Sequence, residues 1–125
     1  MEKVLGVYRR VSNLSETTLE GLEHIYNLTM DGRFEETVVL YTDVATSFHE
    51  MQMALAVHLP EYEGSEMRKM ADDVIAGMKL VLAAYENERD VRPMEVMQFA
   101  MLPAYRRWHE ELQETLGLIC APSMH

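Results

Sequence analysis

The chain has little that a secreted or fibrous protein needs. It holds a single cysteine, Cys120, so an internal disulfide is excluded and nothing requires an oxidising compartment. With only 6 glycines and 4 prolines among 125 residues, a collagen-like or low-complexity chain is also excluded. We therefore expect one globular domain that resides in the cytoplasm.

Long apolar runs are absent as well. No stretch approaches the ~20 apolar residues that a membrane-spanning helix needs. The first ten residues, MEKVLGVYRR, lack the uninterrupted apolar segment and small-residue cleavage site of a secretion signal. We expect neither a membrane partner nor secretion.

Basic residues are scarce. The 11 Lys and Arg against 21 Asp and Glu give a formal charge of −10, which opposes binding to nucleic acids and anionic membranes. The excess is concentrated in the middle of the chain, because residues 31–60 carry one Arg against five acids. It is explained either as an ordinary solubilising surface or as an acidic face for a basic partner.

The residues that are present follow helical periodicity in four segments. The first segment ends at Met30-Asp31-Gly32, where glycine can form a left-handed helix cap. The second ends before Pro60, and Ser65 is a suitable N-cap for the third. The fourth begins near Pro93, and Pro103 inside it predicts a kink.

The second segment has the most regular pattern. Its apolar positions alternate by four and three residues and predict a buried face, interrupted once by a glutamine: Phe34, Val38, Tyr41, Ala45, Phe48, Gln52, Leu55 and Leu59. Met53 projects beyond this face.

Four amphipathic segments with short connections predict an all-α fold, an antiparallel up-down-up-down four-helix bundle. Residues 1–117 form this single domain and residues 118–125 are expected to be a C-terminal tail. A dimer of helical hairpins would have the same pattern.

Two fragments resemble the HExxH zinc-protease signature without completing it. His49-Glu50 is followed by Met53 where the second histidine belongs, and His109-Glu110 is followed by Gln113. Neither a thioether nor a carboxamide replaces imidazole well as a zinc ligand. Cys120 has no evident base nearby. We therefore predict no metal, no cofactor and no catalytic residue.

Two clusters combine arginine with aromatic residues, Tyr8-Arg9-Arg10 and Tyr105-Arg106-Arg107-Trp108-His109. Such residues favour anion or peptide sites. If the first and fourth helices run antiparallel, however, Arg106 and Arg107 fall near Glu20 and Glu23, and ion pairs between helices explain the pattern without a ligand.

Methionine is unusually frequent, with 11 residues. Methionine fills irregular gaps in cores, and it also lines adaptable protein-binding grooves. The sequence does not decide between these two uses.

The stretches EVMQFAMLPAYRRWHEELQETL and DGRFEETVVLYTDVATSF resemble a family of small, acidic helical proteins from spore-forming Gram-positive bacteria. The shared features are a Leu-Pro within the last helix, a tryptophan five residues later, and a Gly-x-Phe helix start. The resemblance covers about half the chain. It implies a helical bundle and carries no activity.

Our functional hypothesis is a non-enzymatic bundle that binds another protein, as a small chaperone or adaptor. The candidate contact residues are Met53, Met97, Met101, Tyr105 and Trp108. One alternative is a small-molecule or metal-dependent enzyme with its site in the bundle core near Gln52 and Ser15. Another is a homodimer or larger homo-oligomer that covers its own apolar surface.

Overall fold

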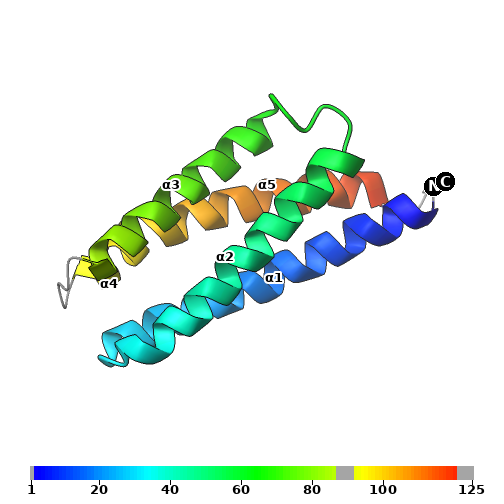
Figure 1. Ribbon diagram of the computed structural model, residues 1–125. Helices are drawn as coiled ribbons and strands as arrows, with labels where there is room; N and C mark the ends of the chain where they lie inside the picture. The colour runs from blue at the N-terminus through cyan, green and yellow to red at the C-terminus, as the bar shows by residue number, and fades with distance from the viewer. Residues whose placement is uncertain (1, 87–91, 121–125) are drawn as a thin grey trace.

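The computed structural model describes residues 2–86 and 92–120 (Figure 1). Three long helices come first: α1 (Glu2–Met30), α2 (Phe34–His58) and α3 (Glu66–Glu86). The fourth helix is continuous but mixed, with α4 (Arg92–Val96), a π-helical turn η1 (Met97–Met101) and α5 (Leu102–Cys120). The described residues contain no strand. The predicted all-α four-helix bundle is confirmed.

The helices begin and end at the capping residues that the sequence indicates. Gly32 is left-handed, with φ 76°. Its N–H donates to the Thr29 carbonyl at 3.1 Å, and the Arg33 N–H donates to the Leu28 carbonyl at 3.0 Å. This pair of bonds is the Schellman motif that ends helices at glycine. Ser65 is the N-cap of α3, because its Oγ accepts from the Arg68 N–H at 3.1 Å.

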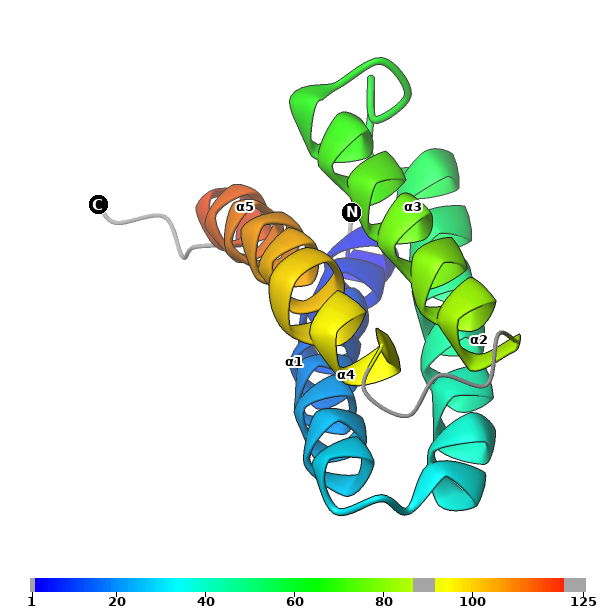
Figure 2. The same cartoon turned by 90° about the vertical axis from the view of Figure 1, so that its left-hand side faces the viewer.

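Pairs of contacting side chains give the relative directions of the helices. Along α1, Ser12 contacts Gln113, Ser15 contacts His109 and Glu23 contacts Arg106. The residue number therefore rises in α1 as it falls in α5. Figures 1 and 2 show α1 beside α2, and α3 beside α5, as two layers.

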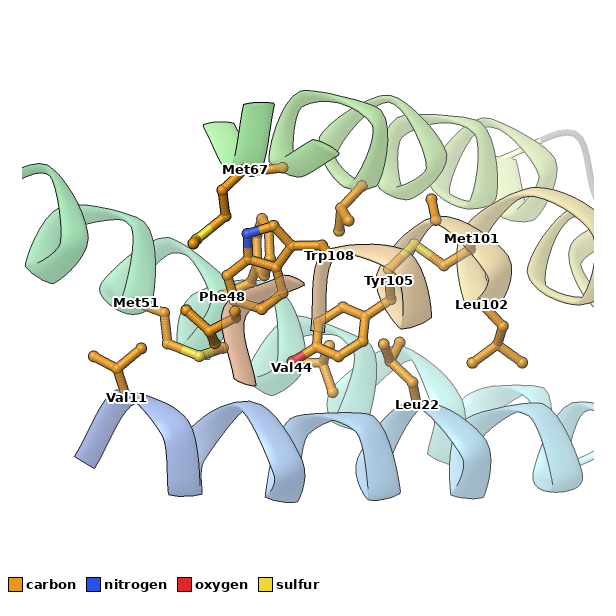
Figure 3. Packing of buried hydrophobic residues seen from close by; sticks show 14 of the residues in the cluster. Val11, Leu22, Val44, Phe48, Met51, Met67, Met101, Leu102, Tyr105 and Trp108 are labelled. Atoms are coloured by element: carbon orange, nitrogen blue, oxygen red, sulfur yellow. The ribbon is translucent and has the colours of Figure 1, made fainter. Parts of the chain in front are cut away.

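The core lies between these layers and is centred on aromatic residues (Figure 3). The ring of Phe48 lies 4.8 Å from that of Trp108 and 5.9 Å from that of Tyr105, measured between centroids. The Tyr105 hydroxyl donates to the Ser15 carbonyl at 2.9 Å, so burial of this ring leaves its polar atom satisfied.

The face that α2 turns to the core differs from the predicted face. Tyr41, Phe48, Gln52 and Leu55 are buried as predicted, but Val38 is exposed and Ala45 is only half-buried. Other residues take their place in the core: Thr37, Val44 and Met51. The buried face is therefore rotated about the helix axis relative to the sequence pattern, which is possible because α2 also carries apolar residues outside the predicted face, among them Val44 and Met51.

The π-helical turn directly precedes Pro103. The Leu102 N–H bonds to the Met97 carbonyl, five residues back, as in a π-helix. Proline has no N–H to donate to the Phe99 carbonyl, so the regular helical bonding pattern is interrupted here. The degree of bending at Pro103 stays a prediction. The end of α5 includes residues 118–120, which the sequence assigned to the tail, and residues 121–125 lie outside the described residues.

Candidate functional site

Four of the five candidate contact residues belong to the core. Met97, Met101, Tyr105 and Trp108 are all 0% exposed, so a partner cannot touch them in this conformation. Met101, Tyr105 and Trp108 come together with Phe48 between the two layers (Figure 3), and Met97 belongs to the same buried cluster. Only Met53 is at the surface, where 57% of it is exposed. The methionines on the fourth helix therefore fill the core, and Met53 is the one candidate contact available to a partner.

Met53 is part of a longer, mostly apolar series on the outer side of α2, which we call the α2 stripe: Val39, Thr46, Met53 and Val57. The first three are spaced by seven residues, or about two turns, so they align along the helix. Val39 is 65% and Val57 is 73% exposed. Apolar side chains this exposed, aligned over about 27 Å of helix, are a feature that marks interaction surfaces.

Carboxylates lie along one side of the stripe and form what we call the acidic flank: Glu36, Asp43 and Glu50. These residues are also seven apart and exposed. Asp43 and Glu50 each lie four residues after a member of the stripe, so each is its neighbour on the helix surface. α2 itself contains no Lys or Arg.

The acidic flank keeps most of its charge uncompensated. Arg33 donates to Glu36 at 2.7 Å, and this hydrogen bond lowers the pKa of the Glu36 carboxyl. Within the described part of the chain, no Lys or Arg lies within ion-pair distance of Asp43 or Glu50. The outer face of α2 is thus apolar along its middle and negative along one edge.

An open pocket of 440 Å³ adjoins the N-terminal end of the α2 stripe. Val39 belongs to both the stripe and the pocket wall, together with Leu28 and Leu40 from α1 and α2. The polar wall is formed by His24, Arg33 and Glu36. A pocket of this size with apolar walls can receive a large side chain of a docked partner.

A buried polar group joins α1 and α5, and sequence reasoning noted only part of it. The Ser15 hydroxyl accepts a hydrogen bond from Gln113 Nε2 at 3.0 Å, and His109 Nδ1 lies 3.1 Å away. His109 Nε2 lies 3.0 Å from a carboxylate oxygen of Glu16. The sequence placed Ser15 in the bundle core, but nothing in it paired Ser15 with His109.

Serine, histidine and glutamate in one chain of contacts are the residue types of a nucleophilic triad. In this protein the three residues are not arranged for catalysis. Ser15 is 0% exposed, and its hydroxyl donates to the Ser12 carbonyl at 2.7 Å, so its proton does not point at His109. A triad needs the serine proton on the histidine and the oxygen open to substrate. This group therefore holds α1 to α5.

A second buried polar group surrounds Gln52. Its Oε1 accepts from the Tyr62 hydroxyl and, at 3.4 Å, from Arg68. Burial raises the pKa of Tyr62, which favours the protonated donor. Among the described residues Gln52 Nε2 and Trp108 Nε1 make no hydrogen bond of ordinary geometry. The Trp108 side chain is nevertheless close enough to the Tyr62 hydroxyl to offset part of the rise in the pKa of Tyr62. Sequence reasoning missed Tyr62, which is buried although it lies in the turn between α2 and α3.

None of three pockets formed by described residues includes the residues proposed for a core enzyme site. Ser15 and Gln52 line neither the 440 Å³ pocket nor the pockets of 230 Å³ and 270 Å³ at the other end of the bundle. In residues 2–86 and 92–120, no group of three or more His, Cys, Asp or Glu side chains could hold a metal ion. His49 is exposed and His109 is bound to Ser15 and Glu16.

The two arginine clusters lie in different surroundings, one at an ion pair between helices and the other at a pocket. Arg106 pairs with Glu23 across the α1–α5 seam at 3.1 Å, as the ion-pair interpretation predicts. Arg9 lines the 230 Å³ pocket with Ser12 and Gln113. Both pair members Arg106 and Glu23 are about half exposed, so this ion pair contributes at most about 1 kcal/mol.

The structure is a small four-helix bundle in which the exposed side of α2 carries a mostly apolar stripe with carboxylates along one edge. Residues 7–111 match the family model described as Domain of unknown function (DUF8042), and the chain belongs to this family. No curated protein and no solved structure matches the chain. No helix in the described segments has the length and apolar character needed to cross a membrane.

Proposed function

We propose that this protein is a non-enzymatic binding module that docks a partner protein on the outer face of α2. The observation that carries the proposal is the α2 stripe, a line of exposed and mostly apolar side chains beside a 440 Å³ pocket. Met53 is at its centre. The role of a small cytoplasmic chaperone or adaptor fits this surface, because both bind other chains through exposed apolar faces.

The physical reason is that α2 is apolar on two sides. Its inner face is covered by the core, through residues such as Phe48 and Leu55. The stripe is a second row of mostly apolar side chains on the opposite side of the helix, and exposed apolar surface of this kind marks interaction sites. Each square ångström of stripe that a partner covers contributes about 25 cal/mol before the costs of association.

The resemblance to small acidic bundles of spore-forming Gram-positive bacteria implies the helical bundle on which this surface lies, and it implies no activity. No catalytic residue is carried over from those proteins. Binding through a shared helical face is a function that such a bundle can perform without one.

The test is a crosslinking affinity purification from the source cell, followed by mass spectrometry. Three baits are compared: the wild type, Met53→Glu, and Leu80→Glu. Leu80 is an exposed apolar residue of α3, with 54% exposure against 57% for Met53, so its variant is the matched control for charge and exposure.

The proposal predicts a partner that the wild type and Leu80→Glu recover and that Met53→Glu loses. Circular dichroism should show that both variants remain folded. Equal recovery by all three baits would locate the binding elsewhere on the surface and reject the α2 stripe. Recovery of only the protein itself would favour the homo-oligomer instead.

A further inference from the structure

Beside the middle of the α2 stripe the charge is one-sided. The acidic flank lies along one edge, while the opposite edge begins with exposed Glu35 and continues with the exposed and uncharged or weakly basic residues Thr42, His49 and Ala56. Asp43 and Glu50 have no cationic partner among the described residues. A partner that covers the stripe brings its own side chains to within a turn of these two carboxylates.

The spacing fits a helix as the occupant. The first three residues of the stripe and the residues of the flank repeat every seven residues, and Val57 follows Met53 by four. Steps of seven, and of four within them, are those at which one helix meets another along a shared seam. In such seams apolar positions pack together, and the flanking charged positions choose the partner. In an extended peptide the side chains on one face repeat every two residues, which does not match the seven-residue repeat of the stripe.

From this placement we infer that the occupant of the α2 stripe is an amphipathic helix of another protein, with an apolar stripe flanked on one side by Lys or Arg. This inference rests on the function proposed above. The partner's apolar side chains would cover Val39, Met53 and Val57, and its basic side chains would face Asp43 and Glu50. A large apolar residue at the end of the partner helix would enter the pocket formed with Leu28 and Leu40.

A second copy of this chain that docks through its own α2 does not have that chemistry. Its own α2 offers the same acidic flank and no Lys or Arg, so two α2 faces bring like charges together. Like charges placed opposite each other disfavour an interface and select against the wrong partner. The formal charge of −10 adds general repulsion between copies.

The test uses two synthetic helical peptides of about three heptads with identical leucine stripes, one flanked by Lys and one by Glu. Binding is measured by fluorescence anisotropy against the wild type, Met53→Glu, and the double variant Asp43→Lys/Glu50→Lys. A second double variant, Glu110→Lys/Glu114→Lys, makes the same charge change on α5 and serves as the control.

The Lys-flanked peptide should bind the wild type and the α5 control equally well. The Asp43→Lys/Glu50→Lys variant should bind it about tenfold more weakly and should prefer the Glu-flanked peptide. Equal weakening by the two double variants would mean general attraction to an acidic protein, and it would overturn the inference.

The cellular partner gives an independent readout that separates the two proposals. If Met53→Glu loses a partner, and Asp43→Lys/Glu50→Lys loses it too, the crosslinked segment should carry Lys or Arg beside its apolar stripe. A partner lost with Met53→Glu but kept by the charge reversal would leave the docking function intact and reject the basic helix. Loss of neither would reject both.

Discussion

Gly77 on α3 lies directly against the backbone of Met101 in the π-helical turn. A Cβ at Gly77 would lie 3.2 Å from the Met101 Cα and 3.4 Å from its Sδ. The absence of a side chain at Gly77 therefore lets α3 approach the fourth helix closely at the point where that helix changes its bonding pattern.

Replacing Gly77 with alanine should destabilise the fold by about 1 kcal/mol or more, since overpacking exceeds the gain in helix propensity. Gly6 is the matched control, because it lies in α1 and a Cβ added there would meet nothing within 4 Å. Gly6→Ala should stabilise by about 0.5–1 kcal/mol. Urea unfolding measures both, and equal effects of the two substitutions would contradict the tight contact.

Trp108 and Phe99 are aromatic residues of the same continuous helix with opposite environments. Trp108 is fully buried and Phe99 is 73% exposed. Trp108→Ala should lower the free energy of unfolding by roughly 3–5 kcal/mol, whereas Phe99→Ala should change it by less than about 0.5 kcal/mol. A large effect at Phe99 would show that its exposed side chain is covered in solution.

Alkaline pH should weaken the fold. Burial raises the pKa of Tyr41, Tyr62 and Tyr105 above the value of about 10 in an unfolded chain. Below about pH 10 both states keep these protons, and the stabilisation is complete. Above it the unfolded state ionises first, so the free energy of unfolding falls as pH rises.

Urea unfolding at a series of pH values between about 8 and 11 measures this loss. Tyr105→Phe removes one of the titrating groups together with its bond to the Ser15 carbonyl, so it should be less stable at neutral pH but lose stability less steeply. Identical slopes for the wild type and the variant would exclude Tyr105 as a source of the alkaline weakening.

Removal of metal should have no effect on stability. The two HExxH-like fragments lack a second histidine, and His109 is engaged by Ser15 and Glu16. EDTA should leave the Tm unchanged within error, and added Zn²⁺ should not raise it. A fall of several degrees with EDTA would require a ligand set that includes residues beyond those described.

Much of the fold could be predicted because its causes are local. Gly32, Ser65 and Pro60 act on their own neighbours in the chain, so the helix ends were predictable from the sequence. The buried face of α2 was not, because a helix with apolar residues on several sides has more than one plausible inner face. Tertiary packing selects Thr37, Val44 and Met51 for the core, and Val38 is left outside.

The candidate site was predictable only at Met53. Its offset from the apolar series already indicated exposure, and the structure places it outside. The methionine and aromatic residues of the fourth helix would form the same sequence pattern in a core and in a groove. Only the packing of the other helices decides which of the two they form. The place of the acidic flank beside the stripe follows from spacing, since Asp43 and Glu50 each lie four residues after a member of the stripe. That both rows are exposed is what the structure adds.

The central claim is that a partner covers the α2 stripe while the core stays closed. The direct measurement is NMR of the protein with ¹³C-labelled methionine methyl groups, titrated with the Lys-flanked peptide. The Met53 signal should shift with the peptide concentration while those of Met97 and Met101 stay in place. An unchanged Met53 signal, or shifts at the buried Met97 and Met101, would contradict the claim.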